Sequence, residues 1–356
     1  MKLADDIRHN AIARGLCARL HEAVELRRRY RLISFCHSHA QAITRHGLGA
    51  LLPSQIELIH GPGCPDCILP AAQIDAAIDL ACSRGVTLCA SDDLLRVPGA
   101  HHTNLFAARA AGADIVAVAT IAEALALARA HPQRDIVHLA SGFETTAPAS
   151  AEALLRARDL ALGNFSVLSH HVLTPAAMRH LLADDAIGER MQLNGFIAPS
   201  HVSRVIGVAP YRSISSDYVK PIVIAGPEPL DVLHAVLMLV EQINECRADT
   251  ENQYARAVTE TGDTAAQRLV DEVFEVRESF LWRGLGRVPH SALTLRPAFA
   301  QWDAERRHAL GTPEAIAMEI SAGHAASAAC TPFTPLDPHL SASACGVRGR
   351  FWPIAS

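Results

Sequence analysis

The 356-residue sequence has no long hydrophobic run and no large excess of charge of one sign. No segment reaches the ~18 consecutive apolar residues that a membrane-spanning helix requires, and residues 1–6 lack the apolar core of a secretory signal. The net charge is −5, which gives no bulk electrostatic attraction to nucleic acid or to an anionic membrane. We therefore expect a cytoplasmic protein that binds neither.

The nine cysteines lack the pattern of a secreted disulfide framework, because their number is odd and they are spread over the whole chain. In a reducing compartment, such cysteines are redox-active, metal-binding or buried. Hydrophobic residues make up 49% of the sequence and charged residues 19%, as in soluble globular proteins. At roughly 100–200 residues per domain, the length allows two or three hydrophobic cores.

Short apolar runs alternate with helical patterns along most of the chain. The runs that we predict to be strands are 32–35, 56–59, 86–90, 115–119, 136–139, 165–168, 195–198 and 222–225. Such alternation is typical of βαβ units with parallel sheets. Because this is too many strands for one small unit, we predict an α/β fold in which two open parallel-sheet lobes face a cleft.

The predicted domains follow one another along the chain. They are an N-terminal helical segment over 1–30, a first lobe over 31–140, a second lobe over 141–245 and a C-terminal region over 246–356. The alternation fades in the last of these, which we expect to be smaller and irregular or helical.

Thiol and polar side chains gather directly after the predicted strands. In open parallel sheets, ligands bind beyond the carboxyl ends of the strands, so these residues accumulate where a site would form. The candidates are Cys36, His37, His39, Cys64, Cys67, Asp93, Glu144, Thr145 and His201.

Cys64 and Cys67 form a C-x-x-C pair behind a Gly-Pro-Gly bend. A structural zinc site normally needs a second such pair, and none is visible. A buried inert pair is a second possibility, and a redox-active or metal-transfer dithiol is the one we favour. The bend allows close backbone approach to a ligand, and a helix beginning near Cys67 would lower the thiol pKa.

Cys36 allows three interpretations: a buried packing residue, a nucleophile beside a histidine, or a metal ligand together with His37 and His39. A second thiol site on a neighbouring strand favours the functional ones. Glu144 and Asp93 are proton carriers or salt-bridge partners, and Thr145 is a ligand contact or a helix cap. We predict that the remaining cysteines of the strand- and helix-like runs serve packing, namely Cys17, Cys82, Cys89 and Cys246.

Several motifs together resemble the HypD family of hydrogenase maturation proteins. They are Leu51-Leu-Pro53, Gly61-Pro-Gly-Cys-Pro-Asp-Cys67, Arg96-Val-Pro-Gly99, Gly142-Phe-Glu-Thr-Thr-Ala-Pro148, Glu228-Pro-Leu-Asp231 and Trp282-Arg-Gly-Leu-Gly286. Members of that family are scaffolds more than turnover enzymes. They work with HypC and HypE to assemble the iron centre, with two cyanides and one carbon monoxide, of [NiFe]-hydrogenase.

The resemblance implies a role for each candidate. It implies an iron-binding thiolate at Cys36, a redox-active dithiol at Cys64 and Cys67, and cleft residues at His39, Asp93, Glu144, Thr145 and His201. It also implies a C-terminal [4Fe-4S] cluster, and Cys330 and Cys345 are its candidate ligands only if that cluster persists. Because such a cluster usually needs four thiolates, we expect that it has been lost.

The sequence departs from the family pattern beside the first thiol. The family's Cys-Gly-Thr-His-Thr is replaced by Cys36-His-Ser-His-Ala40, which adds an imidazole at His37. This imidazole supports an alternative hypothesis, a divergent paralogue acting as a thiol oxidoreductase or zinc-binding protein. Such a protein would use Cys36, His37 and His39 with Cys64 or Cys67.

Overall fold

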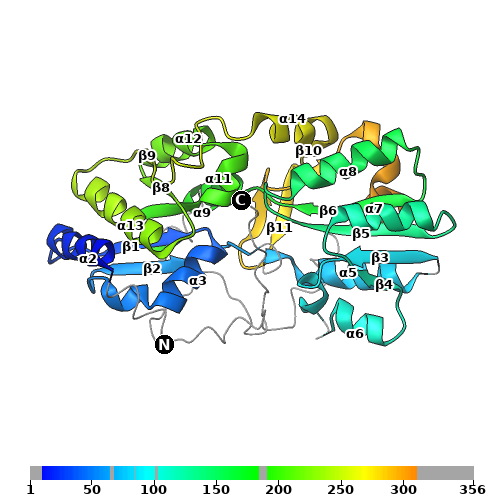
Figure 1. The fold of residues 1–356 in the computed structure, drawn as a ribbon, viewed down its shortest axis with the longest axis horizontal. Helices are drawn as coiled ribbons and strands as arrows, with labels where there is room; N and C mark the ends of the chain where they lie inside the picture. Colours follow the sequence, from blue (N-terminus) through cyan, green and yellow to red (C-terminus); the bar gives the residue numbers. More distant parts are fainter. Residues whose placement is uncertain (1–9, 65–67, 84, 101–102, 184–190, 311–356) are drawn as a thin grey trace.

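Two parallel β-sheets form the centres of two lobes. The computed structural model describes residues 10–64, 68–83, 85–100, 103–183 and 191–310 (Figure 1). One sheet has the strand order β2-β1-β7-β8-β9 and the other β4-β3-β5-β6, and every pairing within them is parallel. The predicted α/β class with parallel-sheet lobes is therefore confirmed. The strands are β1 (Tyr30–Ser34), β2 (Ile56–His60), β3 (Val86–Ala90), β4 (Ile115–Ala117), β5 (Asp135–Gly142), β6 (Phe165–His171), β7 (Gly195–Pro199), β8 (Ile222–Ala225) and β9 (Thr250–Asn252).

Helices cover both faces of each sheet. In the five-stranded lobe, α2, α3 and α13 pack on one face, and α9, α11 and α12 lie on the other. In the four-stranded lobe, α5 covers one face, while α7, α8 and α14 form the opposite layer. The helices of these layers are α2 (Ala11–Ala23), α3 (His37–His46), α5 (Ala71–Cys82), α7 (Ile121–Ala130), α8 (Ala147–Asp159), α9 (Thr174–Ala183), α11 (Ser200–Ile206), α12 (Ala209–Tyr218), α13 (Pro229–Asn244) and α14 (Thr264–Val273).

Shorter helical segments complete the description. They are α6 (Leu105–Ala110), α15 (Ala304–Arg307) and the 3-10 turns η1 (Leu48–Leu51), η2 (Leu94–Arg96) and η3 (Pro297–Trp302).

The local sequence explains why these elements form. The residues of β8 are all apolar and all buried, as expected of a strand covered on both faces. Asn10 caps α2 by accepting from the backbone N–H of Ile12 and Ala13. Gly47 ends α3 in the left-handed conformation at φ 60°. The predicted helix over 1–30 is shorter than expected in its described part, because it ends at Ala23.

The predicted division into consecutive lobes is wrong for the sheets. After β2 the chain leaves the first sheet, builds the whole four-stranded sheet from β3 to β6, and then returns with β7, β8 and β9. A boundary at residue 140 thus falls within β5 and separates strands of one sheet. The apolar pattern identifies strands but does not encode which strand pairs with which. The order of the strands in the sequence therefore does not predict which sheet each strand joins.

Residues 246–310 are also more integrated than predicted. β9 joins the five-stranded sheet, and α14 packs on α8 of the other lobe. Two antiparallel pairs follow, β10 (Phe274–Val276) with β13 (Leu293–Leu295) and β11 (Ser279–Trp282) with β12 (Gly286–Pro289). Figure 1 shows β11 between the two lobes. This part of the chain therefore helps to connect the lobes.

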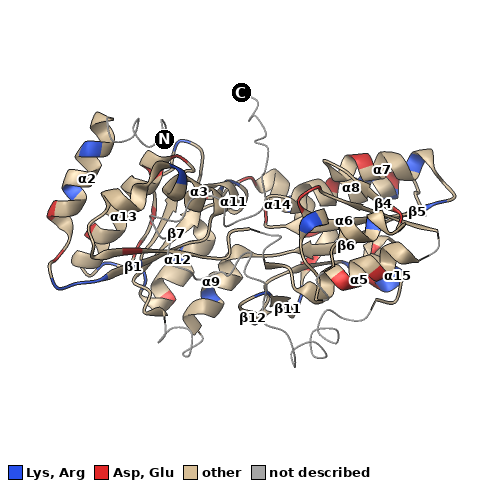
Figure 2. Ribbon diagram, turned by 90° about the horizontal axis from the view of Figure 1, so that it is seen from below, with Lys and Arg blue, Asp and Glu red and all other residues tan. Residues whose placement is uncertain are grey.

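Charged residues of both signs are interspersed over the outer helices. Figure 2 shows Lys, Arg, Asp and Glu distributed over both lobes, with few along the central strands. Among the described helices, none is long and apolar enough to cross a membrane.

Candidate functional site

Cys36 lies where three strand ends meet. In the parallel register, Ser34 at the end of β1 is level with His60 of β2 on one side and Ile197 of β7 on the other. Cys36 follows as the N-cap residue of α3, in extended conformation, and only 1% of its surface is exposed. The predicted position beyond the carboxyl ends of parallel strands is therefore observed.

The surroundings of Cys36 favour its thiolate. Burial raises the pKa of the Cys36 thiol, but His201 and the backbone N–H groups of Ser38 and His39 lower it, and the net pKa is below the ordinary value. The Sγ of Cys36 lies 3.7 Å from Nδ1 of His201, the second residue of α11. Proximity to the start of α3 acts in the same direction. The structure thus brings together two of the predicted residues.

The Gly-Pro-Gly bend packs directly against Cys36. The backbone N–H of Gly61 donates to the Ser34 carbonyl at 2.8 Å, and that of His37 donates to the Gly63 carbonyl at 3.3 Å. A Cβ added at Gly63 would lie 2.6 Å from the His37 nitrogen and 2.7 Å from the Cys36 carbonyl carbon. Only glycine fits here, and this close approach holds the start of the Cys64 loop beside the Cys36 backbone.

Not every predicted thiol is described. Cys64 is half-buried, while Cys67, Cys330 and Cys345 lie outside the described residues. Ile68, directly after the dithiol, is helical, and the next helix, α5, begins at Ala71.

His39 is buried and has partners at both ring nitrogens. Its Nε2 lies 3.2 Å from the carbonyl oxygen of Ala225 and its Nδ1 lies 2.9 Å from the hydroxyl of Ser34. Since a carbonyl only accepts, Nε2 carries the proton and Nδ1 accepts from Ser34. Burial lowers the pKa of His39 to about 4, so the ring is neutral. His39 therefore ties the end of β8 to the end of β1, with no ring nitrogen left for a metal.

Glu144 and Thr145 come from the four-stranded lobe, after β5. Both carboxylate oxygens of Glu144 accept from Thr174, one from its backbone N–H at 2.7 Å and one from its hydroxyl at 2.9 Å. Burial raises the pKa of Glu144 to about 7, although these donors act in the opposite direction. Such a carboxyl exchanges a proton near neutral pH. Thr145 is exposed.

Asp93 and His37 belong to different lobes but influence one another. Asp93 is exposed at the start of η2, and its carboxylate raises the pKa of His37, opposing the larger lowering effect of burial. Asp93 is thus an electrostatic neighbour of the Cys36 loop.

Sequence reasoning missed Arg283, which connects the β11–β12 turn to two site loops. Its backbone N–H donates to the Ile68 carbonyl at 2.7 Å, and its Nε donates to the Leu69 carbonyl at 2.8 Å. Its Nη2 donates to the Pro98 carbonyl at 3.0 Å. The neighbouring Trp282 is buried, with its ring centre 6.4 Å from that of Phe143. In the sequence, only the Trp-Arg-Gly-Leu-Gly motif indicated that Arg283 has a role.

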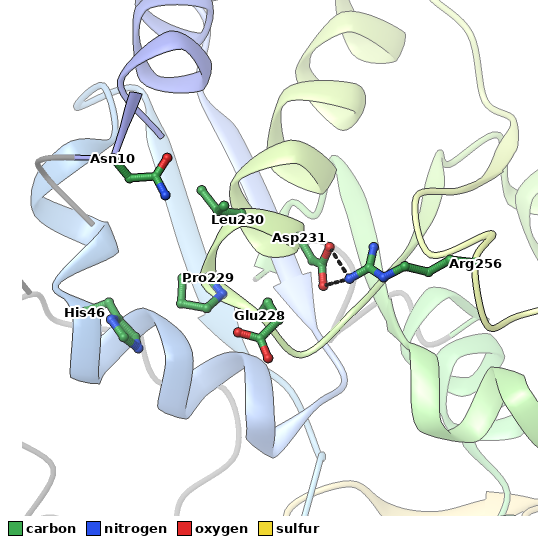
Figure 3. Close-up of a pocket in the computed structure, with 7 residues that line it drawn as sticks. All are labelled: Asn10, His46, Glu228, Pro229, Leu230, Asp231 and Arg256. Atoms are coloured by element: carbon green, nitrogen blue, oxygen red, sulfur yellow. Dashed lines mark hydrogen bonds and ion pairs between the residues drawn. The ribbon is translucent and has the colours of Figure 1, made fainter. Parts of the chain in front are cut away.

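A separate pocket of about 330 Å³ lies at the start of α13. Figure 3 shows Asp231 facing Arg256, whose Nη2 donates to both carboxylate oxygens at 2.9 and 2.7 Å. Glu228 and His46 also line this pocket. The Glu-Pro-Leu-Asp motif therefore has a structural role here, and none of the predicted site residues lies in the lining.

The predicted packing role of four cysteines holds for only part of the set. Cys89 is fully buried in the core and Cys17 is half-buried, but Cys82 and Cys246 are exposed, so the prediction was wrong for these two. Cys82 is the last residue of α5, and Cys246 lies in a left-handed turn after α13 at φ 54°. Within the described ranges, no group of three or more His, Cys, Asp or Glu side chains is arranged to hold a metal ion.

Comparison with known proteins supports the resemblance seen in the motifs. The family described as "HypD: Hydrogenase formation hypA family" matches residues 11–347. The chain belongs to the HypD family. It is 52% identical to the hydrogenase expression/formation protein HupD of Azotobacter chroococcum mcd 1, over 87% of this chain and 82% of that protein. It is 40% identical to the hydrogenase maturation factor HypD of Rhodobacter capsulatus, over 99% and 98% of the two chains.

The HypD match extends over every described site residue from Cys36 to Arg283. The hydrogenase maturation factor HypD of Azotobacter vinelandii is 51% identical over 87% of this chain. The site therefore lies within the part of the chain that matches the HypD family.

Proposed function

We propose that this chain is a maturation scaffold on which the Fe(CN)2CO centre of a [NiFe]-hydrogenase is assembled. In this proposal it works with a HypC-type chaperone and a HypE-type cyanide donor, and iron is its cargo. The observation that carries the proposal is the Cys36 thiol, buried at the start of α3 with its pKa lowered beside His201. A soft thiolate suits low-spin iron that carries strong-field cyanide and carbonyl ligands.

The other residues have supporting roles in this proposal. Cys64 and Cys67 form the dithiol, which on closing to a disulfide would give two electrons and two protons to the bond that holds cyanide on the HypE-type donor, so that cyanide leaves and the donor's thiol is restored. Glu144 is a buried proton carrier near neutral pH, because its pKa is about 7. Asp93, Thr145 and His201 line the approach to the iron, and His39 holds the strand ends together.

Infrared spectroscopy tests the proposal directly. Protein purified anaerobically after co-expression with HypC- and HypE-type partners is expected to show cyanide and carbonyl stretches and about one iron per chain. Cys36→Ala should lose both bands and iron, whereas Cys89→Ser, which changes a core thiol, should retain them. Wild-type protein without these bands would overturn the proposal.

We further propose that the chain works without a [4Fe-4S] cluster, because Cys330 and Cys345 are only two of the four thiolates that such a cluster usually needs. The purified protein should then show no iron–sulfur absorption at about 400 nm.

The alternative function is a thiol oxidoreductase or zinc-binding protein. The half-buried imidazole of His37 beside the thiols favours it. His39 is not available as a zinc ligand, since both its ring nitrogens are hydrogen-bonded. Stoichiometric zinc without iron in the anaerobically purified protein would favour this alternative.

A further inference from the structure

Two imidazole rings lie close together beside the Cys36 loop. His37 begins α3 and His60 ends β2, and their ring centres lie 6.3 Å apart at an interplanar angle of 59°. The Nδ1 atom of each ring is buried and has no hydrogen-bond partner among the residues that the structure describes. A buried polar atom without a partner is costly, so two on neighbouring rings point to a ligand that both could bind.

We propose that His37 and His60 form a two-imidazole docking point for divalent iron on its way to Cys36. The inference rests on the proposed function, in which iron is the cargo, and adds where the ion is held before the thiolate takes it.

The spacing of the rings fits one shared ion. With a metal–nitrogen distance of about 2.0–2.1 Å, two imidazoles on one ion place their ring centres roughly 4.5 Å apart at a right angle and about 6.4 Å apart when they are trans. The observed 6.3 Å therefore fits two imidazoles on nearly opposite sides of one ion. Imidazole nitrogen is a suitable ligand for iron and zinc alike.

Gln41 is placed to orient the His37 ring. Its amide nitrogen lies 2.9 Å from Nε2 of His37, one helical turn along α3, and in this orientation the amide N–H donates to Nε2. Metal binding at Nδ1 requires the amide to turn by 180°, so that Nε2–H donates to the amide oxygen and the Nδ1 lone pair is left for the ion. Histidines that bind metals commonly donate their second ring N–H to an oxygen in this way.

The surrounding charges favour temporary binding. The Asp93 carboxylate acts on His37 and attracts a cation. The start of α3, in contrast, favours the anionic thiolate of Cys36 over a cation at His37. Two protein ligands also leave coordination positions open for water or for an incoming thiolate. The ion is therefore held weakly and passes to the adjacent Cys36.

Anaerobic titration of the full-length chain with Co²⁺, a spectroscopic substitute for Fe²⁺, tests the inference. In a variant with Cys36, Cys64 and Cys67 changed to Ala, we expect one Co²⁺ site without thiolate charge-transfer absorption. Adding His37→Gly or His60→Gln should weaken that site at least tenfold, whereas His21→Gln on the exposed face of α2 should not. Equal affinity with and without the two imidazoles would overturn the inference.

A second measurement uses the chain with all cysteines present. There we expect two Co²⁺ sites, one at the two imidazoles and one at the Cys36 thiolate. His37→Gly should remove the imidazole site, and Gln41→Glu should tighten it severalfold. An unchanged number of sites in His37→Gly would overturn the inference even if the triple variant does not fold. Failure of the infrared test with an intact imidazole site would instead contradict the proposed function alone.

Discussion

The ionisation of one thiol decides what the site can bind. Burial favours the protonated form of a cysteine, and at Cys89 burial together with the nearby Asp114 carboxylate raises the pKa to about 12. Cys36 differs because His201 and two backbone N–H groups stabilise its thiolate. The contrast between two buried cysteines in one chain shows that hydrogen-bond donors, and not exposure, set the difference.

Replacing His201 should therefore raise the pKa of the Cys36 thiol towards its ordinary value. We expect His201→Gln to raise the Cys36 pKa and so to lower the thiolate absorbance at about 240 nm, followed in a pH titration through neutral pH. The signal is taken as the difference from a Cys36→Ser chain with the same change at 201. Cys89→Ser serves as the control, because its thiol is not ionised at that pH. An unchanged Cys36 titration in His201→Gln would show that the backbone donors suffice.

At the same scale, the sequence predicted some partners and missed others. The sequence predicts that Cys36 and Cys64 lie close together, because each follows an apolar run that is predicted to be a strand. Neighbouring parallel strands end at the same edge of a sheet. Thr174, which binds Glu144, and the neutral, fully bonded state of His39 were not predictable. Both depend on contacts between residues distant in sequence, which no local spacing records.

Among the elements, the turn that carries Cys64 depends on glycine at one close contact. A methyl group at Gly63 would overlap the backbone of Cys36 and His37. We expect Gly63→Ala to destabilise the chain by about 1–3 kcal/mol, because neither backbone segment can move freely. The midpoint of urea unfolding measures this effect.

Gly15→Ala is the matched control for this prediction. Gly15 lies in α2 with nothing within 4 Å of the added Cβ, so alanine should stabilise the helix by up to about 1 kcal/mol. If both variants unfold at the same urea concentration, the close contact at Gly63 does not limit the turn.

Element boundaries were predicted more accurately than element partners. The apolar runs over 86–90, 195–198 and 222–225 became β3, β7 and β8 almost without change, because buried parallel strands are apolar on both faces. β9, with the sequence Thr-Glu-Asn, has no such pattern and was missed. It joins the sheet only because β8 offers an open edge.

For the whole molecule, buried neutral histidines predict sensitivity to acid. Burial lowers the pKa of His138 to about 4 and those of His170 and His171 to about 3. Between these values and the unfolded pKa of 6.5, the unfolded chain binds protons that the folded chain does not. Stability is therefore lost as pH falls below 6.5, by up to about 1.4 kcal/mol per pH unit for each group.

Glu144 acts in the opposite direction, because its folded pKa of about 7 exceeds its unfolded value of 4.5. It adds stability as pH falls from 7 towards 4.5, but it is one group against five, because burial also lowers the pKa of His39 and of His60 to about 4. We expect the melting temperature to fall between pH 6.5 and 4, and His138→Met to make that fall less steep. Calorimetry across this pH range measures both, and equal slopes in the two proteins would contradict the assignment of His138.

The bonds from Arg283 to Ile68, Leu69 and Pro98 also affect the order of events during synthesis. The loop that follows the dithiol is translated early, but the residue that fixes it comes more than two hundred positions later. At 5–20 residues per second, the ribosome needs roughly 10–40 s to cover that interval. A nascent chain thus exposes its thiols before it has the means to position them. If iron is the cargo, as proposed above, its loading belongs to the finished polypeptide and not to the growing one.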